Sequence, residues 1–162
     1  MAATSSIGSF LDEFKIDLDA RSGLDGVRVF TAPVDEIVEG DEAIILGHES
    51  IAGEWTRATM TCIGERFTVP CRIISFKPGA TNIASTGHAT EASTTAARLR
   101  ALAILEEVYD AAESDHHGSS TVQDINITGV TIEQAPYEQG STPGRICSIG
   151  FTLTVDAMFD PA

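Results

Sequence analysis

The chain begins with an apolar pattern that predicts an amphipathic helix over about residues 5–21. Apolar residues recur there at intervals of three and four, which places them on one face of an α-helix, and acidic residues occupy the opposite face. The recurring apolar residues are Ile7, Phe10, Leu11, Phe14 and Leu18. Thr4, Ser5 and Ser6 are each suited to cap the N-terminus, and the SGLDG run at 22–26 supplies a C-terminal glycine and a turn.

Four shorter apolar runs follow and predict β-strands. They are residues 27–32, 42–48, 54–62 and 65–77. The last two are joined across Ile63–Gly64 and are expected to pair in antiparallel fashion. Pro70 has no N–H to donate, so it predicts a sheet edge or a bulge in the last run. The acidic segment 34–41 reads as an exposed loop.

The middle of the chain predicts a loop and then a long helix. Residues 78–90 (PGATNIASTGHAT) are small, polar and glycine-bearing, which is typical of a mobile loop. From Thr90, which is able to cap a helix, a broad apolar face continues to Ala112, and Gly118 is expected to end the helix. At about 26 residues and 1.5 Å per residue, this helix would span roughly 40 Å, enough to cross a sheet.

The last third predicts two long β-runs, 122–134 and 145–159, joined by a turn or exposed hairpin loop with the sequence APYEQGSTPG. In the second run, apolar residues occupy seven alternate positions from Cys147 to Phe159, and the residues between them are mostly small and polar. In the first run the alternation slips, which predicts a bulge near Gly129.

This order of one helix, four strands, one helix and two strands lacks a regular βαβ alternation. We therefore predict an α+β fold: a mainly antiparallel sheet of about six strands, two helices packed on one face, and a long C-terminal hairpin. At 162 residues, a single domain spanning 1–162 is expected. The hairpin is expected to reach past the globular body and to contact a neighbouring subunit through its tip, 136–143. The alternative is a twisted hairpin that folds back over its own helices.

Composition restricts the class of partner. Hydrophobic residues make up 43% of the chain and charged residues 21%, as in ordinary globular proteins. Ten Lys and Arg stand against 24 Asp and Glu, a net charge of -14, which argues against general binding to nucleic acids or anionic membranes. No apolar run approaches the ~20 residues of a membrane span, and the N-terminus lacks the features of a signal peptide. An intracellular protein is expected.

Charge is distributed unevenly along the chain. Residues 1–54 carry a net charge of -9, residues 55–100 carry +4, and residues 101–162 carry -9. Two interpretations are open. The acidic ends are simply solvated, or one cationic surface of the subunit meets an acidic surface of its neighbour.

The sequence contains no motif that indicates catalysis or a cofactor. Glycine-rich phosphate-binding motifs, the nucleophile elbow and the HExxH zinc motif are all missing. Cys62, Cys71 and Cys147 are odd in number and widely spaced, so reduced thiols are expected. The neighbouring His116 and His117 invite a metal hypothesis, but adjacent side chains at a helix end diverge. We expect no enzymatic activity, no bound metal and no cofactor.

The candidate functional residues are therefore contact residues. Exposed aromatic residues are enriched at interfaces, which favours Trp55 and Tyr137, although Trp55 suits a core equally well. Arginines that alternate with apolar residues on adjacent strands are expected to face an acidic partner surface. The candidate interface residues are Trp55, Arg57, Arg66, Arg72, Tyr137, Glu138 and Arg145.

The pattern as a whole resembles one protein family over nearly the entire chain. Besides the acidic N-terminal helix, the stretches that carry the resemblance are GLDGVRVF (23–30), AIILG (43–47), ERFTVPCRI (65–73), ARLRALAILEEVYDA (97–111) and TGVTIEQAPYEQGSTPGRICSIGFTLTV (128–155). In this order and spacing they resemble the tail-terminator (minor tail) proteins of long-tailed bacteriophages, especially those infecting actinobacteria. The chain departs from the family in its long polar insertion before the second helix.

The resemblance implies a subunit of a hexameric ring at the head-proximal end of the phage tail tube. Such a ring stops tube polymerisation and joins the tail to the head connector, without catalysis or cofactor. The implied partners are further copies of the chain, the tail tube protein and head–tail connector proteins, with duplex DNA only as passing cargo and no membrane. The implied location is the virion, after assembly in the host cytoplasm. Alternatives are a stopper or adaptor ring of the connector, or a small intracellular α+β enzyme or ligand-binding domain.

Overall fold

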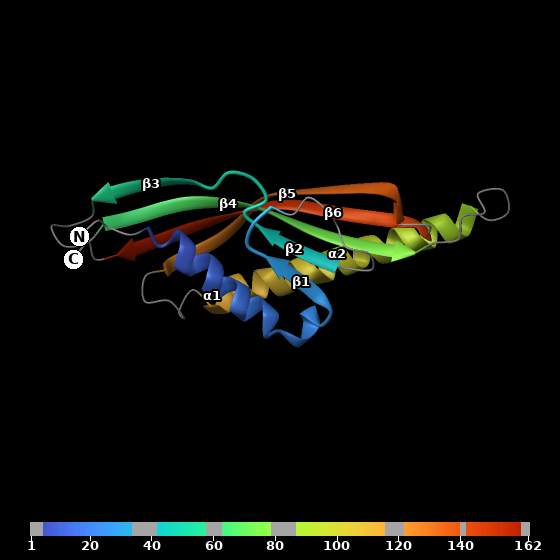
Figure 1. Cartoon of the computed structure of the whole chain (residues 1–162), viewed down its shortest axis with the longest axis horizontal. Helices are drawn as coiled ribbons and strands as arrows, with labels where there is room; N and C mark the ends of the chain where they lie inside the picture. Colours follow the sequence, from blue (N-terminus) through green and yellow to red (C-terminus); the bar gives the residue numbers. More distant parts are fainter. Residues whose placement is uncertain are drawn as a thin grey trace.

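A computed structural model describes residues 5–33, 42–57, 63–78, 87–115, 122–139 and 142–159. Figure 1 shows a long twisted sheet with both helices beneath it. In chain order the elements are α1 (Ile7–Asp19), the 3-10 helix η1 (Ser22–Leu24), β1 (Val27–Phe30), β2 (Glu42–Leu46), β3 (Ala52–Arg57), β4 (Ile63–Pro78), α2 (Gly87–Asp115), β5 (Val122–Gln139) and β6 (Thr142–Phe159).

The six strands form one sheet in the order β1-β2-β4-β6-β5, and β3 pairs with the first half of β4. Only β1 and β2 are parallel. β6 is an inner strand that pairs with β4 over its whole length, from Ile63–Phe159 to Pro78–Gly144, and with β5 on its other side. One edge of the sheet is therefore β5, and β1 and β3 form the other edge. The predicted α+β class, the mainly antiparallel sheet and the long hairpin are confirmed.

The core lies between the sheet and the two helices. The apolar residues that recur along α1 meet the alternating apolar residues of β4 and β6 and the small inner face of α2. Fully buried members include Phe14, Leu18, Phe67, Ile104 and Leu153. Burial of such side chains is worth about 1.5–3 kcal/mol each, so this layer stabilises the fold. In the part of the chain that the structure describes, neither helix is long and apolar enough to span a membrane.

The predicted loop between the last two runs is wrong in length. β5 continues to Gln139 and β6 begins at Thr142, so most of APYEQGSTPG is strand, with Ala135 paired to Ile146 and Pro136 to Arg145. A proline is tolerated in β5 because β5 is an edge strand. The hairpin stays in the sheet rather than folding back over the helices. Because β4 accompanies β6 as far as Gly144, the tip overhangs β4 by only a few residues.

Other predicted boundaries shift by a few residues. β4 includes Pro78, and α2 begins at Gly87, so the predicted loop 78–90 is shorter than expected. The interpretations placed on residues 34–41, and those placed on Cys62, His116 and His117, lie outside the described residues.

Pro70 lies inside the sheet, contrary to the prediction of an edge or a bulge. It pairs with Thr152 of β6 in continuous register. On its other side, β3 pairing ends at Thr68 and β2 pairing begins at Cys71, so Pro70 sits where one neighbour replaces the other. Its carbonyl accepts a bond from the His48 N–H (2.9 Å) on that side. The N–H and C=O groups of a strand residue point to the same side. The N–H that Pro70 lacks would therefore point between the end of β3 and the start of β2, where no ladder bond is lost.

Two glycines explain local features of the hairpin. The predicted bulge near Gly129 is confirmed, because the β5–β6 register shifts between Thr128 and Thr131 and Gly129 has φ of 63°. At Gly144 a side chain would overlap the Lys77 carbonyl and the Phe76 ring, so only glycine lets β6 approach the end of β4.

Candidate functional site

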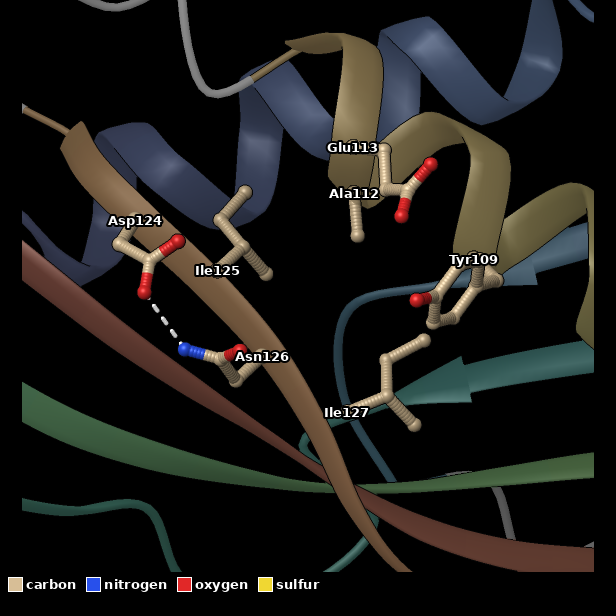
Figure 2. Close-up of a pocket in the computed structure, with 7 residues that line it drawn as sticks. All are labelled: Tyr109, Ala112, Glu113, Asp124, Ile125, Asn126 and Ile127. Atoms are coloured by element: carbon tan, nitrogen blue, oxygen red, sulfur yellow. Dashed lines mark hydrogen bonds between the residues drawn. The ribbon is translucent and has the colours of Figure 1, made fainter.

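One candidate surface of the molecule lies between α2 and the edge strand β5. At one end of this contact the Gln134 side chain donates a hydrogen bond to the Thr94 carbonyl (3.2 Å). Toward the other end, Tyr109 of α2 stands near Ile127 of β5 (Figure 2). From Thr94 to Tyr109 the helix rises about 22 Å, and from Ile127 to Gln134 the strand spans about 23 Å. The two elements therefore run alongside one another in opposite directions.

A cavity of about 450 Å³ lies at the Tyr109 end of this contact. We call it the α2–β5 groove, and its lining residues are Tyr109, Ala112, Glu113, Asp124, Ile125, Asn126 and Ile127. Figure 2 shows the Tyr109 hydroxyl turned toward the strand and Ile127 directed toward the Tyr109 ring. The Asn126 amide donates to Asp124 (2.6 Å) along the strand. The lining thus combines apolar side chains with two carboxylates, and none of its described residues is basic.

The edge of β5 continues beyond the groove without a partner strand among the described residues. Val130 and Ile132 remain 47% and 45% exposed on it. On the neighbouring helix, Leu102 and Tyr109 are also exposed, at 37% and 51%. Long edges of this kind pair with other chains unless they are covered. This side of the molecule therefore offers both a strand edge and apolar surface.

A second cavity of about 390 Å³ lies at the opposite end of the sheet from the hairpin tip, near Arg66 and Asp156. Arg66 of β4 donates two bonds to Asp156 of β6 (2.6 and 3.0 Å). Hydrogen bonding from Arg66 lowers the pKa of Asp156, and the same contact raises the pKa of Arg66. The sequence predicts that Arg66 faces a partner. In the structure the Arg66 guanidinium binds Asp156 of the same chain, and the Arg66 side chain is still 59% exposed.

Glu65 is a buried carboxylate that docks the start of α1 onto the sheet. It is 2% exposed and accepts bonds from the Ser5 hydroxyl, the Ser6 hydroxyl and N–H, and the Trp55 indole N–H (2.5–2.8 Å). Burial raises the pKa of Glu65, but these hydrogen bonds outweigh it and the net pKa is lowered. Ser6, expected as a possible cap, makes no side-chain cap bond to its own helix. Instead, the carboxylate of Glu65, which belongs to β4, lies at the positive N-terminal end of α1.

Two further glutamates join elements that are distant in sequence. Glu42 of β2 accepts bonds from Lys77 of β4 (3.0 Å) and Arg100 of α2 (2.6 Å). Desolvation raises the pKa of Glu42. The hydrogen bonds and charges of Arg100 and Lys77 together outweigh this effect, so the net pKa is lowered. Glu107 of α2 accepts a bond from Arg21, just after α1 (2.7 Å). Sequence reasoning missed all three glutamates, because a single acidic residue in a strand or helix carries no signal of its distant partner.

The other candidate interface residues are scattered. Trp55 is 55% exposed although its indole N–H binds Glu65, so it is neither a core residue nor a free one. Arg72 of β4 pairs with Gly150 of β6 and Ile45 of β2, and it is half-buried. Arg145 lies near the hairpin tip opposite Pro136. Arg57 ends β3, and Tyr137 and Glu138 lie near the end of β5; their side chains lie outside the described structure.

The described cysteines are free and buried in the core. Burial raises the pKa of Cys71 to about 12 and also raises that of Cys147. Thiols that stay protonated at neutral pH are poor nucleophiles and poor metal ligands. Over the described ranges, no three His, Cys, Asp or Glu residues gather in a way that would hold a metal ion.

Comparisons with known proteins find similarity among solved structures alone. No protein-family model matches the chain, and no curated protein matches it. Among solved structures, the chain is similar to one described as "Virion of native gene transfer agent (GTA) particle". The identity is 15%, the TM-score is 0.43, and the match covers 94% of this chain and 99% of the other. A similarity of this size carries no functional argument.

Proposed function

We propose that this chain is a virion structural protein, without enzymatic activity, that assembles into a ring. Its most specific form is a tail terminator: a hexamer that caps the head-proximal end of a phage tail tube, ends tube polymerisation and joins the tail to the head connector. The partners would be further copies of the chain, the tube protein and connector proteins. The resemblance in the order and spacing of elements supports this assignment.

The single observation that carries the proposal is the pair of unlike open edges of the sheet. β5 offers one edge, 18 residues long, and β1 and β3 offer the other. An edge that meets a different edge on the next copy makes a head-to-tail contact, and such contacts form a ring when the rotation between copies closes. The half of β5 beyond the bulge, which includes Val130 and Ile132, and the hairpin tip with Tyr137 and Glu138 are the proposed self-contact.

Charge is consistent with this role. A net charge of -14 suits a channel through which duplex DNA slides, because a phosphate-binding wall would retain the DNA. Arg57, Arg66, Arg72, Arg145 and Trp55 remain proposed contact residues. Arg66 would contribute through the exposed part of its guanidinium while Asp156 fixes its direction.

The first experiment measures assembly of the purified chain. Native mass spectrometry should find six copies of 17.1 kDa, about 103 kDa, alone or together with the tube protein. Electron microscopy of virions should place the ring at the head end of the tube. A chain that stays monomeric at every concentration, both alone and with tube protein, would contradict the proposal. A ring located between the portal and the terminator position would favour the stopper or adaptor alternative.

A pair of charge reversals tests the contact surface. Arg72→Glu and Arg145→Glu should weaken the ring and shift its salt dependence, because charges at an interface rim govern encounter and register. Lys15→Glu on α1 is the control, since Lys15 is partly exposed and forms its ion pair with Asp19 of the same helix. Equal effects of all three reversals would refute a specific role for the two arginines.

A further inference from the structure

We propose that the α2–β5 groove binds an extended, basic segment of a different protein, which adds as a strand beside Asp124–Ile127. This goes beyond ring formation, because it uses the half of β5 before the bulge and assigns a second class of partner. It does not depend on the ring. The open backbone edge, the apolar lining and the charge of the groove together favour such an occupant.

The backbone of β5 supplies the first part of the site. Asp124–Thr128 pair with β6 on one side, and no described strand pairs with them on the other. Their outward N–H and C=O groups are therefore available to an incoming strand, which gains affinity from main-chain bonds whatever its sequence. The cavity of about 450 Å³ lies between this edge and the flank of α2, so there is room for a segment of chain (Figure 2).

The apolar lining supplies the second part. Ile127 and Leu105 are only partly buried against the core, and Tyr109 is 51% exposed. Leu102 lies seven residues before Tyr109 and so presents its side chain on the same flank of α2. An added strand directs alternate side chains toward this flank. One or two aliphatic side chains of a partner would therefore be buried here.

Charge identifies the partner. Glu113 and Asp124 line the groove, Glu106 is exposed on the same helix, and none of the described residues that line the cavity is basic. The pKa of Tyr109 is raised through its interaction with Glu113, a sign of the anionic surroundings. Long cationic side chains of lysine or arginine in the incoming segment would neutralise these carboxylates, so the partner segment is basic.

A second copy of this chain fits the groove poorly. Many of its cations are engaged within the chain: among the described residues, Lys15, Arg21, Arg66, Lys77 and Arg100 each form an ion pair. A separate basic protein is therefore the occupant that the charges favour.

The test uses labelled peptides and fluorescence anisotropy on the full chain. The probes are a nine-residue alternating Lys–Val peptide, the matching Glu–Val peptide, and a Lys–Val peptide N-methylated along one edge. We expect the Lys–Val peptide to bind, the Glu–Val peptide not to bind, and N-methylation to weaken binding at least tenfold, since it removes strand addition. No binding of the Lys–Val peptide, or equal binding of its N-methylated form, would overturn the proposal.

Two double variants separate the groove from general electrostatic attraction. Glu113→Gln with Asp124→Asn should weaken Lys–Val binding at least tenfold. Asp12→Asn with Glu13→Gln removes the same charge from the exposed face of α1 and should change binding less than twofold. Equal losses in the two double variants refute a specific site. Native mass spectra of the same variants report the ring separately, so failure of this proposal and failure of ring assembly are distinguishable.

Discussion

The region beside α1 and the region beside the β5 edge differ in what their acidic residues contact. We call them the α1 side and the β5 side. On the α1 side, Glu42, Glu65 and Glu107 each bind donors from elements far away in sequence. On the β5 side, Glu113 and Asp124 face an open cavity. One side is tied together by buried or half-buried carboxylates, whereas the other exposes carboxylates, apolar side chains and a strand edge.

This difference shows that the acidic composition serves two purposes. A carboxylate that satisfies several buried donors fixes the position of a helix, because leaving those donors unpaired costs about 1–3 kcal/mol each. A carboxylate left at a groove contributes little to stability and is available for recognition. The stabilising carboxylates thus lie in the region beside α1, and the carboxylates open to a partner lie beside the β5 edge.

The largest expected contrast is between two isoleucines that pair directly across β5 and β6. Ile149 is fully buried and Ile132 is 45% exposed, although they occupy partner positions. Ile149→Ala should lower the free energy of unfolding by about 3–4 kcal/mol, and Ile132→Ala by about 0.5 kcal/mol. Urea titrations of both variants measure this. Similar losses would mean that the β5 side is packed as tightly as the core.

Removing the Glu65 side chain should have the next largest effect. Glu65→Ala leaves the Ser6 N–H, the serine hydroxyls and the Trp55 indole without their shared acceptor, so we expect a loss of about 3 kcal/mol. Hydrogen exchange should show reduced protection in the first turns of α1. Glu49→Ala, at an exposed position, is the control and should stay within about 0.5 kcal/mol. A loss below 1 kcal/mol for Glu65→Ala would argue against its docking role.

Acid should weaken the α1 side through the same groups. The pKa values of Glu42 and Glu65 lie below the ordinary value of 4.5, so the unfolded chain binds more protons than the folded one as the pH falls. Their contribution is complete above about pH 5 and is lost as the pH drops through the folded values. Glu42→Gln with Glu65→Gln should flatten the profile of unfolding free energy between pH 5 and pH 3, measured by urea titration. An unchanged slope would contradict this assignment.

The smallest expected effect concerns glycines with positive φ. Replacing one on the α1 side and one on the β5 side should cost about the same free energy of unfolding. Gly129 in β5 and Gly26 beside α1 both have positive φ (63° and 82°), and a Cβ atom added at either glycine would meet no other atom within 4 Å. Gly129→Ala and Gly26→Ala should each cost about 1 kcal/mol, and asparagine should recover part of it. Thermal or urea unfolding measures both. A clearly larger cost at Gly129 would show that the bulge shapes the β5 edge beyond its own backbone.

Much of the fold was predictable from local patterns, and the contact surfaces were not. The seven alternating apolar positions of β6 and the three-and-four spacing of α1 identified elements whose apolar faces do form the core. Pro70 misled the prediction because its effect depends on which strand lies beside it, a property of the sheet order. The α2–β5 groove was missed for the same reason. Tyr109 and Asp124 belong to elements that only the topology brings together.

The order of the strands also has a consequence for synthesis. β4 is complete at Pro78, but β6, the strand that pairs with it along its whole length, ends at Phe159. At roughly 5–20 residues per second, a ribosome takes about 4–16 s to make the intervening ~80 residues. During that interval one edge of β4 lacks its main partner. A nascent chain paused before β6 would therefore be the form most prone to aggregation and most in need of a chaperone.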